Sequence, residues 1–101
     1  MAIAEISVVP LGTKTPSVSR YVARAVKVVE QEKDIKYEIT AMGTIVEGDL
    51  DRILAVVRKM HEETFGSGVT RVVTTVRIDD RRDKAQSMKG KVDSIKKKLQ
   101  D

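Results

Sequence analysis

The hydrophobic and polar positions of this 101-residue chain alternate in some stretches and recur at helical spacing in others. Strict alternation predicts strands with one face on a core, over residues 2–9, 35–41 and 70–78. Residues 42–47 are expected to form a further strand directly behind the second one. The side that this strand turns inward stays open, because both Ile45 and Val46 could face the core.

Three stretches carry helical spacing. The first helix is expected to start with Thr15 as N-cap and Pro16 at the first helical position, and to fade near Glu32. The second is expected to start at Asp49 as N-cap and to stop at residues 65–68. Its buried stripe is expected to be Leu50, Ile53, Leu54, Val57, Met60 and Thr64. A third helix over residues 85–100 carries a narrow apolar seam of Met88, Val92, Ile95 and Leu99.

The order of these elements is strand, helix, strand, strand, helix, strand, with one helix added at the end. This order predicts an α+β fold of the ferredoxin-like βαββαβ class, with a four-stranded antiparallel sheet and two helices on one face. We expect a single domain over residues 1–101. Because its seam is too thin to form a core alone, the added helix is expected to pack on a partner subunit or on the edge of its own domain.

Composition removes most metal and redox chemistry. The chain has no Cys and one His, which argues against disulfides, Cys-ligated zinc and multi-His metal sites, so we expect neither metal nor cofactor. It also has no Asn, as in heat-adapted proteins, which have few thermolabile amides. We find no apolar run long enough for a membrane span and no secretory signal, so no membrane partner is expected.

Charge is distributed unevenly along the chain. Residues 1–80 hold 11 basic and 12 acidic side chains, whereas residues 81–101 hold 8 basic and 3 acidic ones. A basic tail can attract polyanions, but it is more often the solvated face of a helix. RNA-binding sheets of this topology stack bases on exposed aromatic side chains. The three aromatics here, Tyr21, Tyr37 and Phe65, lie on helices or on the inward face, so nucleic acid is an unlikely partner.

The sequence contains no recognisable set of catalytic residues. Residues 10–15 place a Lys-Thr before a helix but lack the paired glycines of a phosphate loop, and they are interpreted as a strand-to-helix turn. His61 is interpreted as a boundary histidine bonded to a neighbour, with a ligand contact or general base beside Glu62 or Glu63 as the alternative. Since no nucleophile is paired with a base, we expect no enzymatic activity and no catalytic residue.

Four sequence motifs allow a comparison with known families. In chain order they cover residues 6–13 continuing to 22, residues 42–48, residues 60–72, and residues 78–84. Together they resemble the thiamine-binding protein family, which is grouped with YkoF-like proteins. The resemblance implies a cytoplasmic ferredoxin-like subunit that assembles into dimers or tetramers. It also implies non-catalytic binding of thiamine or its hydroxymethylpyrimidine moiety by a carrier, buffer or sensor. The alternative is a structural or regulatory oligomer that acts through a protein partner, without a physiological role in thiamine binding.

Such a ligand would need hydrogen-bonding groups for its aminopyrimidine, an apolar slot for the flat ring, and a carboxylate for a thiazolium cation. Motif position and chemistry together nominate Ser7, Met42, Gly43, Thr44 and Glu47, with Glu38 and His61 as second-line candidates. Two alternatives remain open at this point. Gly43 and Gly48 could serve only the turns, and Glu47 could only pair with a neighbouring Arg.

Overall fold

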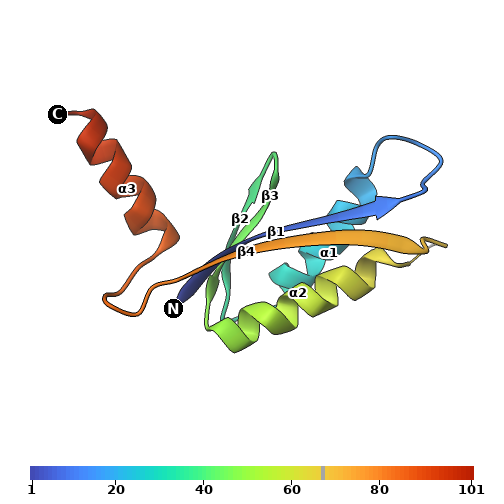
Figure 1. Cartoon of the computed structure of the whole chain (residues 1–101), viewed down its shortest axis with the longest axis horizontal. Helices are drawn as coiled ribbons and strands as arrows, with labels where there is room; N and C mark the ends of the chain where they lie inside the picture. The colour runs from blue at the N-terminus through green and yellow to red at the C-terminus, as the bar shows by residue number, and fades with distance from the viewer. Residues whose placement is uncertain (67) are drawn as a thin grey trace.

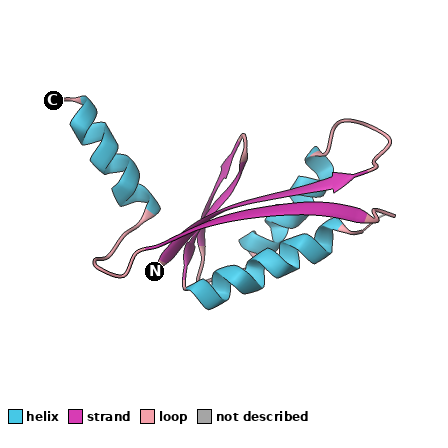
Figure 2. Ribbon diagram, in the orientation of Figure 1, coloured by secondary structure: helices cyan, strands magenta, loops and turns pink. Residues whose placement is uncertain are grey.

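The computed structural model describes residues 1–66 and 68–101 (Figures 1 and 2). Ser67, within the expected stop of the second helix, lies outside the described residues. The elements in chain order are β1 (Ala2–Leu11), α1 (Ser19–Glu30), β2 (Lys36–Thr40), β3 (Gly43–Gly48), α2 (Leu50–Thr64), β4 (Arg71–Asp80) and α3 (Met88–Leu99). None of the described helices is long and apolar enough to cross a membrane.

The four strands form one antiparallel sheet in the order β2-β3-β1-β4. Helices α1 and α2 pack on one face of this sheet, and the other face carries no helix layer (Figure 1). The core lies between the sheet and these two helices, around Ile6, Val29, Val46, Ile53 and Met60. The ferredoxin-like fold expected from the order of the elements is therefore confirmed.

Strand β1 has two different edges. It pairs with β4 along its whole length, from Ala2 to Leu11, but with β3 only as far as Ile6. The strand runs two residues past its expected end and includes Pro10. Proline removes one backbone donor, and a strand tolerates this where it lacks a neighbour on one side. Beyond Ile6, the edge of β1 that faces β3 is therefore open.

The register settles which side of β3 faces the core. Val46 pairs with Ala4 and is fully buried, whereas Ile45 pairs with Glu5 and lies on the open face. The alternation over residues 35–41 places Ile39 on the inward face with Tyr37, and the register agrees, because Ile39 pairs with the buried Thr44 and Tyr37 with the buried Val46. Strand β2 is at the edge of the sheet, however, and the Ile39 side chain is 65% exposed.

Two expectations about the helices are wrong: the residue at which α1 begins, and part of the buried stripe of α2. Helix α1 begins at Ser19, not at Thr15 and Pro16, because the Thr15 hydroxyl accepts a hydrogen bond from the Ser17 backbone N–H at 3.0 Å and closes a separate turn. In α2, Asp49 is the N-cap residue but makes no side-chain capping bond. The buried residues of α2 are Ile53, Val56, Met60 and Thr64. Of the other residues predicted for this stripe, Leu50 and Val57 are only partly buried and Leu54 is 47% exposed.

Helix α3 begins at Met88, three residues later than expected, because the Ser87 hydroxyl caps it by accepting from the Gly90 backbone N–H at 2.9 Å. None of its residues is buried. Figure 1 shows it standing apart from the sheet and from the other two helices. The Cα radius of gyration is 15.1 Å, against about 13 Å for a compact chain of 100 residues.

Candidate functional site

A pocket of about 210 Å³ lies where β1 and the β2–β3 hairpin separate. Pairing between these strands stops at Ile6 and Thr44, and the hairpin diverges from β1 beyond that point (Figure 1). The start of α1 and one side chain of α2 close the gap. The lining residues are Ile6, Ser7, Val8, Val9, Val18, Val22, Ile39, Thr40, Ala41, Met42, Gly43, Thr44 and Met60.

The tip of the hairpin is held by one hydroxyl. Thr40 and Gly43 pair across a two-residue turn of Ala41 and Met42. The Thr40 hydroxyl donates to the Gly43 carbonyl at 2.7 Å and accepts from the Met42 backbone N–H at 3.2 Å. Because the turn is fixed from within, one wall of the pocket keeps its shape. Met42 itself is 81% exposed and lies at the mouth.

Gly43 allows β3 to approach β1 closely at the edge of the pocket. A Cβ atom at this position would lie 2.8 Å from the backbone oxygen of Ile6. The φ angle of +157° adds strain for any L side chain. Gly43 is therefore required by the contact between the two strands, and not only by the turn.

The pocket carries no charged side chain among its lining residues. Its polar lining residues are Ser7, Thr40 and Thr44, beside the open backbone edge of β1. Thr44 is buried, and no hydrogen bond involves the side chain of Ser7 or Thr44 within the part of the chain that the structure describes. Apolar walls with a few hydroxyls and free backbone groups suit a flat, uncharged, hydrogen-bonding ring.

Of the seven nominated residues, four line this pocket: Ser7, Met42, Gly43 and Thr44. Glu47 lies at the opposite end of β3, where its side chain is buried on the open face. Its Oε1 accepts a hydrogen bond from the Met88 backbone N–H at 2.7 Å, and its Oε2 lies 4.0 Å from the Lys36 ammonium. Glu47 thus contacts the first residue of α3 and a lysine.

Glu38 and His61 lie outside the pocket as well. Glu38 is exposed on β2, opposite Ile45 of β3. His61 points from α2 to β4, where its Nδ1 lies 2.7 Å from the Thr74 hydroxyl. Its ring also meets Phe65 edge-on, with the ring centroids 5.2 Å apart. This arrangement is that of a boundary histidine bonded to its neighbours.

Sequence reasoning missed the apolar walls of the pocket. Val18 and Val22 recur at helical spacing in the sequence, yet they face the pocket from the start of α1. Ile39, on the inward face of β2, lines the pocket as well. Nothing in the spacing of these residues distinguishes a pocket wall from a core face. No group of three or more potential metal ligands occurs among the described residues.

Comparisons with known proteins agree on one family. The sequence pattern of the family described as "Thiamine-binding protein" matches residues 4–96. The UPF0045 protein YqgV of Bacillus subtilis (strain 168) is 48% identical over 103 residues, which span 99% of each chain.

Two crystal structures share the fold. The hypothetical protein MJ1052 of Methanocaldococcus jannaschii is 42% identical, with a TM-score of 0.87 over 94% of this chain and 95% of that one. A Thermotoga maritima protein named for thiamine biosynthesis or salvage has a TM-score of 0.77 over 93% of this chain and 97% of that one. At 22% identity, this second likeness supports the fold alone.

Proposed function

The chain belongs to the thiamine-binding protein family, and from that premise we propose that the pocket beside β1 binds the aminopyrimidine ring of thiamine or of hydroxymethylpyrimidine. One observation carries the proposal. Four residues of the family motifs, Ser7, Met42, Gly43 and Thr44, line one small, uncharged pocket. The protein acts in this proposal as a non-catalytic, cytoplasmic carrier, buffer or sensor.

The size and charge of the pocket favour the pyrimidine half of the ligand. Its volume of about 210 Å³ is below the roughly 300–1,000 Å³ of sites for drug-sized ligands, so it suits one substituted ring. A thiazolium carries a fixed positive charge, which is costly to bury without a carboxylate. Since no carboxylate lines the pocket, the thiazolium of thiamine would remain at the mouth near Met42.

The polar groups of the pocket match an aminopyrimidine. The exocyclic amine needs acceptors, and the ring nitrogens need donors. The Thr44 and Ser7 hydroxyls can act as either, and the backbone of β1 beyond Ile6 offers both kinds of group on its open edge. No nucleophile and base pair lines the pocket, which supports binding without chemistry.

Parallel calorimetric titrations with hydroxymethylpyrimidine, thiamine and thiamine phosphate test this proposal. We expect saturable binding of hydroxymethylpyrimidine and of thiamine with similar affinity, because the shared ring is the recognised part. Thr44→Val keeps the shape but removes the hydroxyl, and should weaken both by roughly fivefold to tenfold, or about 1 kcal/mol. Absence of heat from all three ligands with folded protein, or unchanged affinity in the variant together with binding that requires Glu47, would contradict this site.

Helix α3 favours a second candidate function, a structural or regulatory oligomer that acts through a protein partner. The observation is that Val92, Ile95 and Leu99 are exposed along one side of this helix. A measurement of molar mass by light scattering tests it, and a monomer at micromolar concentration would contradict it. The two candidate functions are compatible, because no residue of α3 lines the pocket.

A further inference from the structure

A second pocket, of about 560 Å³, lies between the end of β1 and the start of α1. We call it the loop pocket, because its walls are residues of the 12–17 loop, the first turn of α1 and residues 68–69 of the loop before β4. Figure 1 shows the 12–18 loop at the end of the molecule away from α3. No described residue lines both this pocket and the one beside β1. The proposed binding of a pyrimidine ring therefore leaves the loop pocket unused.

The charged side chains that line the loop pocket are all positive. They are Lys14 and Arg20, and no described acidic residue joins them in the lining. Neither cation has an ion pair with a carboxylate in the part of the chain that the structure describes. By contrast, two of the three cations in the pocket at the start of α3, Arg81 and Lys91, pair with aspartates. Two uncompensated cations beside one cavity favour an anionic ligand.

A buried tyrosine also lines the loop pocket. Only 6% of Tyr21 is exposed. Its hydroxyl oxygen accepts a hydrogen bond from Arg20 Nη2 at 3.3 Å, and the guanidinium carbon of Arg20 lies 5.2 Å from the centroid of its ring. Among the described residues, the Tyr21 hydroxyl hydrogen has no acceptor. Since a buried hydroxyl usually finds a partner for its hydrogen, Tyr21 has a donor left for a ligand oxygen, next to a guanidinium that its own ring holds in place.

Further donors border the loop pocket at the start of α1. The N-cap residue is Val18, which makes no side-chain capping bond, and the first turn holds no acidic residue. The first backbone N–H groups, those of Ser19 and Arg20, therefore lack an acceptor within the helix. The hydroxyls of Ser17 and Ser19 both line the pocket and lie 3.5 Å apart, too far for a strong hydrogen bond. These donors add to the two cations and to the tyrosine, and the positive end of the helix dipole acts in the same direction.

We infer that the loop pocket binds the phosphoryl group of a small phosphate ester, at a site separate from the pyrimidine pocket. A phosphoryl group has three terminal oxygens and about two negative charges, which match a pocket with two cations and several neutral donors. Arg20 can offer parallel N–H groups to two of the oxygens, and Lys14 a mobile point charge. The volume of about 560 Å³ lies within the roughly 300–1,000 Å³ of sites for small molecules. It leaves room for the organic part of an ester beside the phosphoryl group.

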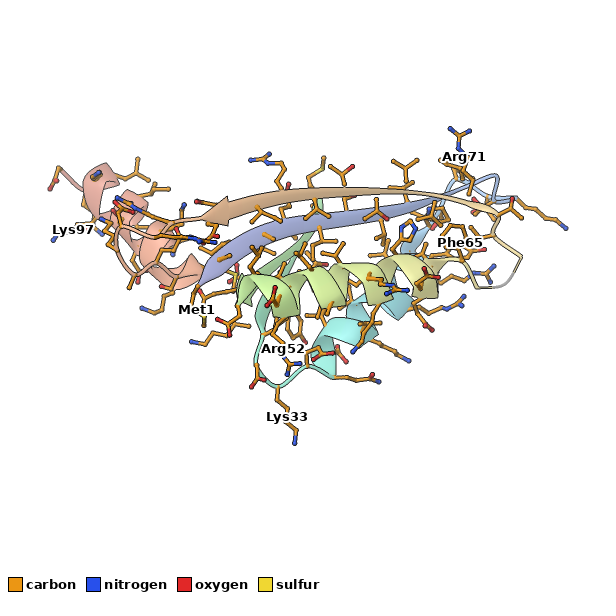
Figure 3. The ribbon with its side chains drawn as sticks, turned by 60° about the horizontal axis from the view of Figure 1, so that its bottom comes forward. Met1, Lys33, Arg52, Phe65, Arg71 and Lys97 are labelled. Carbon is orange, nitrogen blue, oxygen red and sulfur yellow. The ribbon has the colours of Figure 1, made fainter. Side chains whose placement is uncertain are left out.

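Titrations of the full chain with glycerol phosphate and with inorganic phosphate, followed by nuclear magnetic resonance at constant ionic strength, test this inference. We expect saturable shifts of the Ser19 and Arg20 backbone amides with both probes, and tighter binding of the ester. Lys14→Gln and Arg20→Gln should each weaken binding by roughly fivefold to twentyfold, because each removes a charged donor, and Tyr21→Phe by roughly threefold. Lys33→Gln is the matched control. It removes the same charge from the loop after α1, away from the pocket (Figure 3), and should leave the affinity unchanged.

Several results would overturn the inference. Equal weakening by Lys14→Gln and Lys33→Gln would show that the net charge of +4, and not a site, attracts the anion. Shifts confined to residues 84–98 would assign the binding to the basic tail, and a folded chain without saturable shifts would exclude it altogether. Equal affinity for the two probes would replace the ester by the free ion. Hydroxymethylpyrimidine binding, measured by calorimetry on the same variants, should stay unchanged, and a parallel loss would contradict the separation of the two sites.

Discussion

The two ends of β3 have opposite chemistry. At the Gly43 end the strand leaves β1, its turn is held by the Thr40 hydroxyl, and the adjoining pocket is lined without charge. At the Glu47 end the strand stays paired on both sides, and a buried carboxylate holds the first residue of α3. Figure 3 shows that α3, with Lys97, lies at one end of the molecule and that Phe65 and Arg71 lie at the other.

This difference separates two tasks within one short motif. Residues 42–48 resemble a single binding motif in the sequence, but Gly43 and Glu47 are four residues apart, which is about 13 Å along a strand. The Gly43 end is suited to a small neutral ring. The Glu47 end is suited to fixing the position of α3. Substitutions at the two ends should therefore affect different measurements.

The largest effect is expected at the Gly43 end. Gly43→Ala would place a Cβ 2.8 Å from the Ile6 carbonyl oxygen, which forces β1 and β3 apart. We expect a loss of about 2–4 kcal/mol in the free energy of unfolding, measured by urea denaturation, together with loss of ligand binding. Gly12→Ala is the matched control, because Gly12 also has a positive φ but has open space around it. Equal losses in the two variants would show that strain in φ, and not the strand contact, is the cause.

The next effect concerns the pocket alone. Val22→Phe would push a ring into the pocket from the second turn of α1 and should weaken hydroxymethylpyrimidine binding by roughly tenfold to a hundredfold, as overpacking costs about 1–3 kcal/mol. Ala23→Phe places the same ring on the exposed side of the helix and should leave the affinity unchanged. If both variants bind like the natural chain, the ligand lies elsewhere.

A smaller effect is expected at the Glu47 end. Glu47→Ala removes the acceptor of the Met88 backbone N–H and should destabilise the attachment of α3 by about 1 kcal/mol. Hydrogen exchange of the α3 amides should become faster, while calorimetry should show unchanged ligand affinity. Glu62→Ala, at an exposed position of α2, should change neither quantity. Loss of ligand affinity in Glu47→Ala would show that both ends of β3 belong to one ligand site.

Much of the fold follows from local pattern. Alternation located three of the four strands, and apolar spacing located all three helices. Every element except α3 buries one face on the shared core. The errors lie where local signals compete. Thr15 and Pro16 resemble a helix start, yet the Thr15 hydroxyl closes its own turn with Ser17 first. Ile39 faces the helix side as the alternation predicts, but β2 is at the sheet edge and the Ile39 side chain stays 65% exposed beside the pocket.

Less of the candidate site than of the fold could be predicted from the sequence. Four of the residues nominated from motif position, Ser7, Met42, Gly43 and Thr44, line one pocket. The apolar walls were not found, because a valine facing a pocket has the same spacing as a valine facing a core. The place of Glu47 depends on α3, whose position is set by contacts 41 residues away in the chain. The different surroundings of the two ends of β3 are visible only in the strand register of the structure.

The smallest predicted effect is a dependence on pH at the start of α3. The hydrogen bond from the Lys91 ammonium lowers the pKa of the Asp79 carboxyl below its usual value of 3.8. A depressed pKa adds stability above the unfolded value, and this stability is lost as the pH falls through the folded value. We expect the α3 amides to lose a little protection as the pH falls below about 4, after correction for intrinsic exchange. The loss is small because the pair is exposed to solvent. Asp79→Asn should remove this pH dependence, while Asp51→Asn, on α2, should leave it in place. A loss of protection that persists in Asp79→Asn would show that the Lys91–Asp79 pair is not its cause.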